Sequence, residues 1–451
     1  MSTELVAAPP QQRRLVAVAT FIGSVVEWYD FFIYGTAAAL VLNTLFFPEF
    51  DRVVGTLLAF VTFAVGWLAR PIGGIVAGHL GDRIGRKTML MVTMVSMGTA
   101  TVLVGLLPTY NQIGVVAPVL LLVFRLIQGL AVGGEYGGSV VMALENAPRG
   151  RRGLWAGLTQ SGVPFGLFLG TVAYTAVEHL PAGAFLAWGW RLPFLTSSVL
   201  IVIGILVRFR ITESKVFEKV QEQEKVTRVP ALEVLRQYPG REVLMLLAHM
   251  APNTFFYTFA VYLLTYATTQ AHFTGSQVLT SLAVAAAVET VTIPLFAAWS
   301  DRIGRKRLYV GGMIALGVLA FPFFLAVNTG SPLLLTVALV VALGGAHAAM
   351  YGPQASLFGE LFPTAIRYSG LSMGYQIAGS IFGGPLPIIA TLLVAVAGGQ
   401  VWIFAAFLVL TAIVSAVAGA FLPENRSDDI DAVGAPRTSK GQQPVLAEHT
   451  A

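Results

Sequence analysis

Two carboxylates lie near the middle of the first long apolar segment of this chain. Glu27 and Asp30 belong to the stretch SVVEWYDFFIYG, within a run that is otherwise mostly apolar from Leu15 to Phe47. A formal charge at the centre of a membrane helix costs about 2.5–3.5 kcal/mol even on the insertion scales that penalise it least. Such residues are retained where another group compensates the charge or where the charge has a function, so both acids are candidates for proton transfer.

Arg125, in the fourth apolar segment, is expected to reach the same depth as these acids. With a rise of 1.5 Å per residue, Glu27 and Asp30 lie roughly 18 and 22 Å along a helix that enters from the cytoplasm near Leu15. Arg125 lies about 12 Å along a helix that enters from the opposite side near Ala117. We therefore expect the three charges to compensate one another in an aqueous cleft between the helices.

Three roles are compatible with this arrangement. Asp30 and Arg125 could form an ion pair that only fixes helix packing, or Asp30 could carry a proton whose binding depends on whether Arg125 is close. Arg125 could also bind a substrate carboxylate, because a guanidinium is always charged and donates two parallel hydrogen bonds. The predicted proton-coupling residues are Asp30, Glu27 and Glu135.

Polar residues in other apolar segments are further candidates for a substrate site. Tyr34 shares one helix face with both acids, and Gln128 shares a face with Arg125. Polar residues in later segments could instead form hydrogen bonds between helices. Glu289 has no partner that the sequence identifies, and His249 is expected to pack between helices. The predicted substrate-binding residues are Arg125, Tyr34, Gln128, Gln160, Asn253, Tyr257, Tyr351, Gln354 and Gln376.

The composition indicates that the segments that carry these residues lie in a membrane. The chain has 451 residues, of which 56% are hydrophobic and only 11% are charged, whereas soluble domains have about 25% charged residues. It contains no cysteine, which excludes disulfides and thiol-ligated metals. No metal-ligand set or nucleophile motif is apparent, so we expect no cofactor and no enzymatic activity. The net charge of +5 is spread between apolar segments, so a nucleic-acid partner is not expected.

Apolar windows of about 20 residues, the length that crosses ~30 Å of hydrocarbon, predict an all-α membrane protein with twelve transmembrane helices. The predicted spans are 15–43, 53–79, 88–107, 115–144, 153–177, 190–208, 242–269, 277–298, 308–327, 333–359, 367–396 and 400–422. The predicted regions are an N-terminal cytoplasmic tail (1–14), a six-helix bundle (15–208), a cytoplasmic linker with an amphipathic helix (209–241), a second six-helix bundle (242–422) and a disordered cytoplasmic tail (423–451).

The short loops set the orientation, because cytoplasmic loops carry an excess of lysine and arginine. Basic residues gather in alternate loops, and the opposite loops hold little beyond Arg52 and Arg191. Both termini are therefore expected in the cytoplasm, with the protein in the inner membrane. The basic residues of the predicted cytoplasmic loops are Arg83, Arg86, Lys87, Arg149, Arg151, Arg152, Arg302, Arg305, Lys306, Arg307 and Arg367.

Two sequence patterns occur twice, and the interval between the copies is nearly the same for both. GDRIGRK begins at Gly81, and SDRIGRK begins at Ser300. The pattern E-x2-P-x3-R begins at Glu145 and again at Glu360. Repeats of this kind predict two six-helix halves related in parallel, with a cavity at their interface near the midplane of the membrane.

The loop motif GHLGDRIGRKTML, at 78–90, resembles the cytoplasmic loop signature of the major facilitator superfamily. The motifs EWYDFFIYG, ARPIGG, RLIQGLAVGGEYGGS, ENAPRGRRG and ELFPTAIRYSG resemble the metabolite:proton symporter family within it. The resemblance implies a symporter that imports a small organic acid with protons by alternating access. Members of that family carry small carboxylates such as α-ketoglutarate, citrate and shikimate, or the zwitterions proline and betaine.

The resemblance also implies a cytoplasmic latch at the repeated motif. Asp82 would face the start of the eleventh helix in the other half, where a carboxylate meets the positive helix end. Arg86 would pair with Glu145, and the second copy of the motif would repeat this arrangement. Arg70, in ARPIGG, could pair with Glu135. The predicted gating residues are Asp82, Arg83, Arg86, Glu145, Arg152, Asp301, Arg302, Arg305, Glu360 and Arg367.

The substrate class stays open between two alternatives. Import of a small organic acid is favoured, and proton symport of a zwitterionic osmolyte such as proline or betaine is the alternative. The short tail after Pro423 has no heptads, which disfavours the osmosensing members, since these carry a coiled-coil extension. A membrane-embedded enzyme or receptor would need a catalytic constellation or signalling domain that the sequence does not show. The expected partners are the substrate, protons and the lipid bilayer, and the expected oligomeric state is a monomer.

Overall fold

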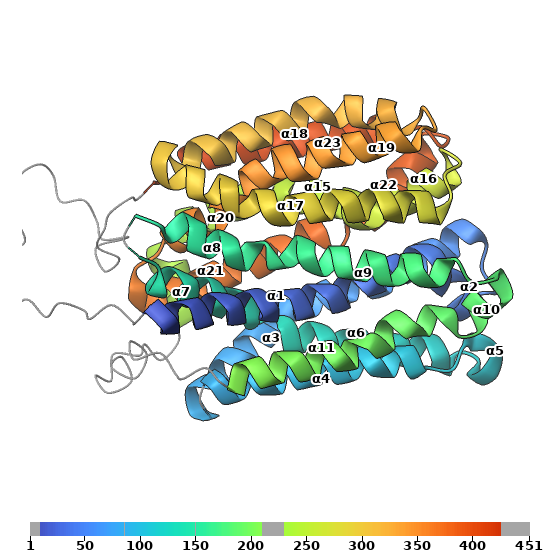
Figure 1. Cartoon of the computed structure of the whole chain (residues 1–451), viewed down its shortest axis with the longest axis horizontal. Helices are drawn as coiled ribbons and strands as arrows, with labels where there is room; N and C mark the ends of the chain where they lie inside the picture. The colour runs from blue at the N-terminus through green and yellow to red at the C-terminus, as the bar shows by residue number, and fades with distance from the viewer. Residues whose placement is uncertain (1–9, 85, 149, 210–229, 425–451) are drawn as a thin grey trace, which may run out of the picture.

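Long helices that run nearly parallel make up the computed structural model, which describes residues 10–84, 86–148, 150–209 and 230–424. Side chains are described for 13–76, 89, 91–148, 150–207, 232–363 and 366–424. In Figure 1 the helices of the N-terminal half, blue to green, lie on one side of the molecule. The helices of the C-terminal half, yellow to red, lie on the other side. The predicted amphipathic helix of the linker and the predicted disordered tail lie largely outside the described residues, at 210–229 and 425–451.

The N-terminal half is built from the helices that precede residue 210. Its outer loops are short, and carboxylate Oδ1 of Asp51 accepts from the backbone N–H groups of Val53 (2.9 Å) and Val54 (3.1 Å) at the first turn of α3. The helices are α1 (Pro10–Ala37), η1 (Ala38–Leu42), α2 (Asn43–Phe46), α3 (Arg52–Ile84), α4 (Arg86–Leu106), α5 (Tyr110–Ile113), α6 (Val116–Val132), α7 (Glu135–Asn146), α8 (Arg152–Gln160), α9 (Gly162–Glu178), α10 (Ala182–Ala187), η2 (Gly189–Arg191) and α11 (Leu192–Phe209).

The C-terminal half begins with a short helix and continues through residue 421. Its longest helix begins at a capping box in which Thr274 accepts from the N–H of Gln277, an arrangement that satisfies two otherwise unpaired backbone donors. The helices are α13 (Pro230–Gln237), α14 (Pro239–Ala248), α15 (Met250–Tyr257), η3 (Thr258–Tyr262), α16 (Leu263–Thr269), α17 (Gly275–Ile303), α18 (Arg305–Val327), α19 (Pro332–Leu339), η4 (Val340–His347), α20 (Ala348–Gly359), α21 (Thr364–Ala378), η5 (Gly379–Gly383), α22 (Leu386–Val396) and α23 (Trp402–Phe421).

Ten helical segments of the described chain are long and apolar enough to cross a membrane. The other two predicted spans coincide with α4, whose described apolar part Met91–Leu106 is shorter, and with α8 and α9, which are separated at Ser161. The prediction of twelve spans is therefore consistent with the structure. The ten segments are Arg13–Phe46, Arg52–Val76, Val116–Asn146, Gly189–Val207, Pro239–Thr269, Gly275–Ile303, Arg305–Val327, Pro332–Gly359, Ile366–Val396 and Trp402–Phe421.

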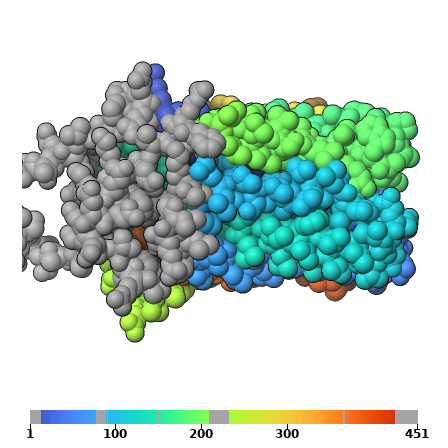
Figure 2. All heavy atoms as spheres, turned by 90° about the horizontal axis from the view of Figure 1, so that it is seen from below, coloured from blue at the N-terminus to red at the C-terminus, as the bar shows by residue number. Residues whose placement is uncertain are grey.

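The outer surface of these helices is apolar along its length. In Figure 2 the helices α11 (green), α4 (blue) and α6 (teal) lie side by side over one face of the molecule. Large aliphatic side chains on these helices are exposed, for example Val202, Leu103 and Val119. In a soluble protein such a surface would promote association, whereas in a bilayer it contacts lipid chains.

Several spans contain a wide π-helical turn, and two of these turns follow the internal repeat. Ala38–Leu42 in the first span and Thr258–Tyr262 in the seventh are both π-helical, and the interval between them matches that between the two copies of the loop motif. The interruption at Ser161 in the fifth span is separated by a similar interval from the π-helical turn Gly379–Gly383 of the eleventh. In these two pairs of spans the halves therefore place irregular turns at equivalent positions, and such turns are frequent at functional sites.

Candidate functional site

A small cavity lies within the N-terminal half, between α1, α3, α4 and α6. The space available to the centre of a water molecule is about 10 Å³, which is room for about one water. It lies where the cleft around Glu27, Asp30 and Arg125 was expected, and every residue that lines it belongs to the N-terminal half. The cavity predicted between the two halves stays a prediction. The lining residues are Glu27, Asp30, Phe31, Gly66, Arg70, Met97, Arg125, Gln128, Gly129 and Val132.

Arg125 and Asp30 share this cavity but are not in direct contact. The guanidinium Nη1 of Arg125 donates to Gln128 Oε1 at 2.9 Å, and Gln128 Nε2 donates to the hydroxyl of Thr101 at 2.6 Å. The Thr101 hydroxyl in turn donates to Oδ2 of Asp30 at 2.9 Å. The hydroxyl of Ser197 donates to Oδ1 of the same carboxylate. The direct ion pair between Asp30 and Arg125, one of the three roles considered, is therefore not formed here, because Gln128 and Thr101 lie between them and relay the interaction.

The guanidinium of Arg125 is buried with unused hydrogen-bonding capacity. It lies over the ring of Tyr34, 3.9 Å from the ring centre, a favourable cation–π geometry. Its Nε and Nη2 are buried and have no acceptor within the described part of the chain, and no carboxylate lies within salt-bridge distance there. Buried donors are nearly always satisfied in native proteins, so this edge of Arg125 is suited to an incoming anion.

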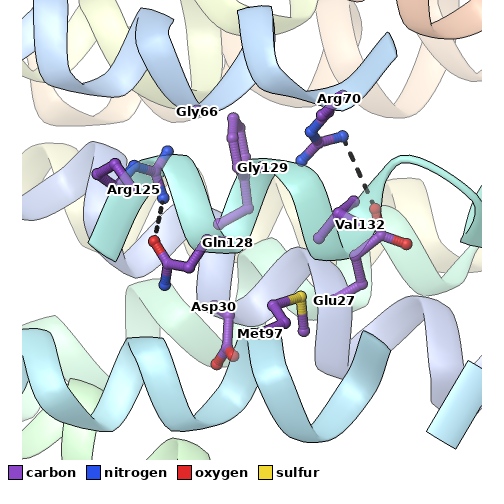
Figure 3. Close-up of a pocket in the computed structure, with 10 residues that line it drawn as sticks. Glu27, Asp30, Gly66, Arg70, Met97, Arg125, Gln128, Gly129 and Val132 are labelled. Atoms are coloured by element: carbon purple, nitrogen blue, oxygen red, sulfur yellow. Dashed lines mark hydrogen bonds and ion pairs between the residues drawn. The ribbon is translucent and has the colours of Figure 1, made fainter. Parts of the chain in front are cut away.

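Arg70 forms the second charged group of the cavity, together with Glu27. Nη1 of Arg70 lies 3.7 Å from Oε1 of Glu27, and both side chains are buried. The guanidinium of Arg70 also stacks on the ring of Trp67, 3.8 Å from its centre. Figure 3 shows Arg70 with Glu27 and Arg125 with Gln128 on opposite sides of Gly129. The predicted proton-coupling residue Glu135 is buried in the first turn of α7, outside the lining of this cavity.

Close helix contacts hold this cavity together. A side chain at Gly129 would meet the backbone oxygen of Gly66, and one at Gly133 would meet the backbone oxygen of Arg70. The absence of side chains lets α6 approach α3 backbone to backbone, as small residues do in membrane helix packing. This contact sets the positions of Arg125 and Arg70, which project from the two helices.

Gly66 also faces the edge of the Arg125 guanidinium that carries Nε and Nη2, called here the open edge. A Cβ at this position would lie 2.9 Å from Nη2 and 3.2 Å from Nε of Arg125. We expect Gly66→Ala to weaken substrate binding by about three- to tenfold, because one charged hydrogen bond contributes about 1.5–3 kcal/mol and the methyl group would displace only part of it. Binding measured by calorimetry tests this. Gly311→Ala is the control, since a Cβ at Gly311 meets no atom, and equal affinities for both variants would contradict the prediction.

A second group of polar side chains lies where the two halves meet. The rings of Tyr136 (α7) and Tyr375 (α21) stack with centres 3.5 Å apart, and Gln376 Nε2 donates to the backbone oxygen of Gly133 at 3.1 Å. Tyr375 also lies 3.4 Å, oxygen to oxygen, from the hydroxyl of Tyr351. Tyr136 and Tyr375 were not among the predicted site residues, because their contact joins two distant segments and no spacing in the sequence indicates it.

The other predicted substrate residues near this interface differ in their hydrogen bonding. Asn253 uses its amide on the backbone oxygen of His249, one turn earlier. Buried polar atoms without a described partner occur on Gln160, Gln354 and Tyr257. These three side chains come from both halves, so they have capacity for a polar solute at the point where the halves meet.

Glu289, which had no partner identifiable from the sequence, pairs with a histidine. Its Oε1 lies 2.5 Å from Nδ1 of His347, and the two side chains are 0% and 1% exposed. The pair joins α17 to η4. The sequence could not indicate this contact, since the two residues lie 58 positions apart on different spans.

At the cytoplasmic end, the second copy of the loop motif joins the two halves. The carboxylate of Asp301 accepts from the backbone N–H groups of Gly153 (2.8 Å) and Leu154 (3.1 Å) at the start of α8. Arg305 lies 3.4 Å from Asp301 and also pairs with Glu360. A carboxylate of one half thus caps a helix of the other half, as the motif implied. Whether this contact gates transport stays a prediction.

The remaining predicted gating residues fall into three groups. The side chains of Asp82, Arg83 and Arg86 lie outside the described residues, so the first copy of the latch is not seen. Arg152 and Arg367 are buried and Arg302 is exposed. Glu145, at the end of α7, is partly buried.

Removal of the Asp301 carboxylate should weaken the closed cytoplasmic side. We expect Asp301→Ala to slow transport by about three- to tenfold with substrate affinity changed less than about twofold, since caps and helix-dipole contacts contribute up to about 2 kcal/mol. Initial rates and binding on the same purified protein test this. Asp51→Ala is the matched control, because Asp51 also caps a helix through two N–H groups but within one half. An unchanged rate in correctly inserted Asp301→Ala protein would refute the gating role.

Comparison with known proteins gives consistent matches. The sequence profile of the family described as "Major Facilitator Superfamily" matches residues 20–384 and 282–447. The shikimate transporter of Escherichia coli (strain K12) is 37% identical over 416 residues, 92% of this chain and 95% of the relative. The inner membrane metabolite transport protein YhjE of the same organism is 38% identical over 389 residues, 85% of this chain and 88% of the relative. The ectoine/proline transporter ProP of Corynebacterium glutamicum is 33% identical over 436 residues, 92% of this chain and 85% of the relative.

Solved structures share the fold at lower sequence identity. The xylose transporter XylE from E. coli, in a partially occluded inward-open conformation, aligns with a TM-score of 0.72 and 18% identity. The alignment covers 92% of this chain and 99% of that chain. The proton:xylose symporter XylE with bound 6-bromo-6-deoxy-D-glucose aligns with a TM-score of 0.70 and 19% identity, over 92% of this chain and 96% of that chain.

Proposed function

This chain belongs to the Major Facilitator Superfamily, and from that premise we propose that it imports a small organic acid together with protons by alternating access. It is a multi-pass membrane transporter and not an enzyme. The relatives at 33–38% identity include transporters named for shikimate and for ectoine and proline. Their names define two substrate classes, and the charges of the site support the choice of an acid.

The open edge of Arg125 is the observation that carries the proposal for an acid. A carboxylate fits the adjacent Nε and Nη2 donors of one guanidinium in a bidentate manner. Both donors are buried and have no described acceptor, while the positive charge is shielded by the Tyr34 ring rather than neutralised by a carboxylate. An anionic substrate would therefore supply the missing charge and the missing acceptors together.

The proposed coupling residues are the two acids of the same cavity. Asp30 is held by hydroxyl donors from Thr101 and Ser197, and it communicates with Arg125 through Gln128. Such a relay lets the charge state of Asp30 and the occupancy of Arg125 influence each other, because both act on one hydrogen-bonded chain. Glu27, paired with Arg70, is the second candidate.

A zwitterionic osmolyte is the alternative, and one observation favours it. The aromatic side chains of Trp67, Tyr257 and Phe31 lie against one another near Arg70, with ring centres 5.4–5.9 Å apart. Aromatic faces bind quaternary ammonium groups, and a betaine carries one such group beside its carboxylate. In this structure the face of Trp67 is occupied by Arg70, so the acid remains the preferred substrate.

We also propose how the two halves, the linker and the termini are arranged relative to the membrane. The halves 15–208 and 242–422 would rock about the polar side chains at their interface, with the linker 209–241 and both termini (1–14 and 423–451) in the cytoplasm. The protein would act in the inner membrane as a monomer, with no nucleic-acid partner and with the latch residues closing its cytoplasmic side. The biased distribution of lysine and arginine among the loops supports this orientation.

Uptake by proteoliposomes tests the proposed function. Purified protein is reconstituted and given an inward acid gradient, with radiolabelled shikimate, α-ketoglutarate, proline and glycine betaine as probes. We expect gradient-dependent accumulation of at least one acid. Accumulation of the zwitterions alone would favour the alternative, and accumulation that is insensitive to the pH gradient would refute proton coupling.

A further inference from the structure

The Glu289–His347 pair lies in the C-terminal half, apart from the cavity that holds Asp30 and Glu27. Oε1 of Glu289 and Nδ1 of His347 are 2.5 Å apart, and both side chains are completely buried. The approach of their helices depends on Gly344, since a Cβ there would meet the Val288 side chain at 2.7 Å. The remaining polar atoms, Glu289 Oε2 and His347 Nε2, have no described partner.

The number of protons on this pair decides its net charge. With one proton, shared between Nδ1 and Oε1, the pair is neutral overall, whether it is an ion pair or an acid beside a neutral imidazole. Without that proton it carries one negative charge, and with a second proton it carries one positive charge. Neither state has a lysine or arginine partner within the described ranges. Because an uncompensated buried charge is very costly, the pair holds one proton while it is sealed.

The titratable groups on the surrounding helices do not change this conclusion. The elements packed against η4 carry His249 at the start of α15, Tyr257 at its end and Tyr351 in α20, and Tyr351 stacks on His347. Asp301, on the same helix as Glu289, lies about 18 Å further along the helix axis. Glu178, which faces the start of that helix beside Gly275, lies about 21 Å from Glu289 on the same basis.

Two aromatic rings separate the pair from the interface between the halves. The imidazole of His347 is stacked between Phe256, with ring centres 5.1 Å apart, and Tyr351, at 5.2 Å. Phe256 contacts Phe32 of the N-terminal half, at 5.5 Å between ring centres. Tyr351 reaches Tyr375, which stacks on Tyr136 of the N-terminal half. Separation of the halves would therefore release both rings and admit water to His347.

We propose that Glu289 and His347 form a second proton-binding site, which exchanges its proton with water when the halves separate and retains it when they close. In the conformation open to one side of the membrane, the proton passes from its position between Nδ1 and Oε1 to water. In the conformation open to the other side, water supplies the next proton. The claim that this proton moves during transport rests on the proposed function. The binding of the proton itself does not depend on any substrate.

A count of protons on the purified protein tests the site without a substrate. Wild type and Glu289→Gln, in detergent, are titrated from about pH 5.5 to about pH 9, a window above the range in which exposed carboxyl groups titrate. We expect Glu289→Gln to release about one proton fewer per molecule. Glu49→Gln, which removes an exposed carboxyl group in an outer loop, should leave the count unchanged, and Glu289→Asp should preserve it. An equal count for wild type and folded Glu289→Gln would overturn the proposal.

His347→Gln provides the second variant, since the site needs both groups. His347→Gln should lower the proton count by the same amount. If Glu289→Gln does not elute as a single species in size-exclusion chromatography, His347→Gln takes its place in the test. In proteoliposomes with shikimate as the probe, each coupled proton multiplies the final ratio of internal to external substrate concentration by about ten per pH unit. Glu289→Gln should therefore accumulate about tenfold less at a gradient of about one unit. If none of the probe solutes is transported, the proposed function fails while the proton count still decides the site.

Discussion

Asp30→Asn is expected to abolish accumulation driven by a pH gradient. Asparagine can accept from one of the Thr101 and Ser197 hydroxyls through Oδ1 and donate to the oxygen of the other through Nδ2, so the packing of α1 against α4 and α11 should survive. It cannot gain or lose a proton at neutral pH. Since Asp30 is the acid that the relay connects to Arg125, substrate movement should then no longer depend on any bound proton, including that of the Glu289–His347 pair. Wild type should reach about tenfold accumulation per pH unit for each coupled proton, whereas Asp30→Asn should reach only equal concentrations on the two sides. Uptake into proteoliposomes with an imposed gradient measures this ratio.

Energy-independent counterflow distinguishes loss of coupling from loss of folding. Asp30→Asn should still exchange labelled for unlabelled substrate, because that process needs binding and alternating access but no net proton movement. Glu27→Gln provides a comparison inside the same cavity, and the variant with the lower accumulation identifies the main carrier. Accumulation by Asp30→Asn at the wild-type level would exclude Asp30 as the coupling residue.

Arg125→Lys is expected to lower substrate affinity by about one to two orders of magnitude. Lysine keeps the positive charge over the Tyr34 ring and can still donate to Gln128. It loses the parallel Nε and Nη2 donors, and one charged hydrogen bond is worth about 1.5–3 kcal/mol. Calorimetry with the transported acid, on purified protein, measures the change.

Arg191→Lys is the control for this substitution. Arg191 donates to the backbone oxygens of Gly105 (2.9 Å) and Leu107 (2.7 Å), away from the cavity. Its replacement should alter stability slightly and affinity not at all. Near wild-type affinity for Arg125→Lys would instead leave Arg125 as a counter-charge for the Asp30 relay and would place the carboxylate site at the interface between the halves.

The depth of each residue along its helix was enough to predict that Asp30, Arg125 and Gln128 share one site. The rise per residue and the direction of each span fix the level of a side chain in the membrane, and the structure places the three around one cavity. The calculation could not supply Thr101 or Ser197, since it says nothing about which helices are neighbours. A direct ion pair was therefore among the roles considered, whereas the structure has a relay through two polar side chains.

Contacts between distant spans were the least accessible from the sequence. The Tyr136–Tyr375 stack and the Glu289–His347 pair join positions far apart in the chain, and hydropathy treats these residues only as polar interruptions of a span. The latch was more accessible because it is a repeated motif with a defined chemical role, a carboxylate that meets a helix start. The π-helical turns were not predicted, since a single wide turn leaves no periodic signal in an apolar segment.

The small size of the cavity in the N-terminal half has a consequence for energy conservation. Protons cross an apolar layer rapidly along chains of hydrogen-bonded water, and exclusion of water prevents such leakage. A space for about one water cannot hold a chain that reaches either membrane surface from Glu27 or Asp30. In this conformation the described residues around this cavity provide no water path for a proton leak, so a membrane that holds many copies of the protein would not lose its gradient by that route.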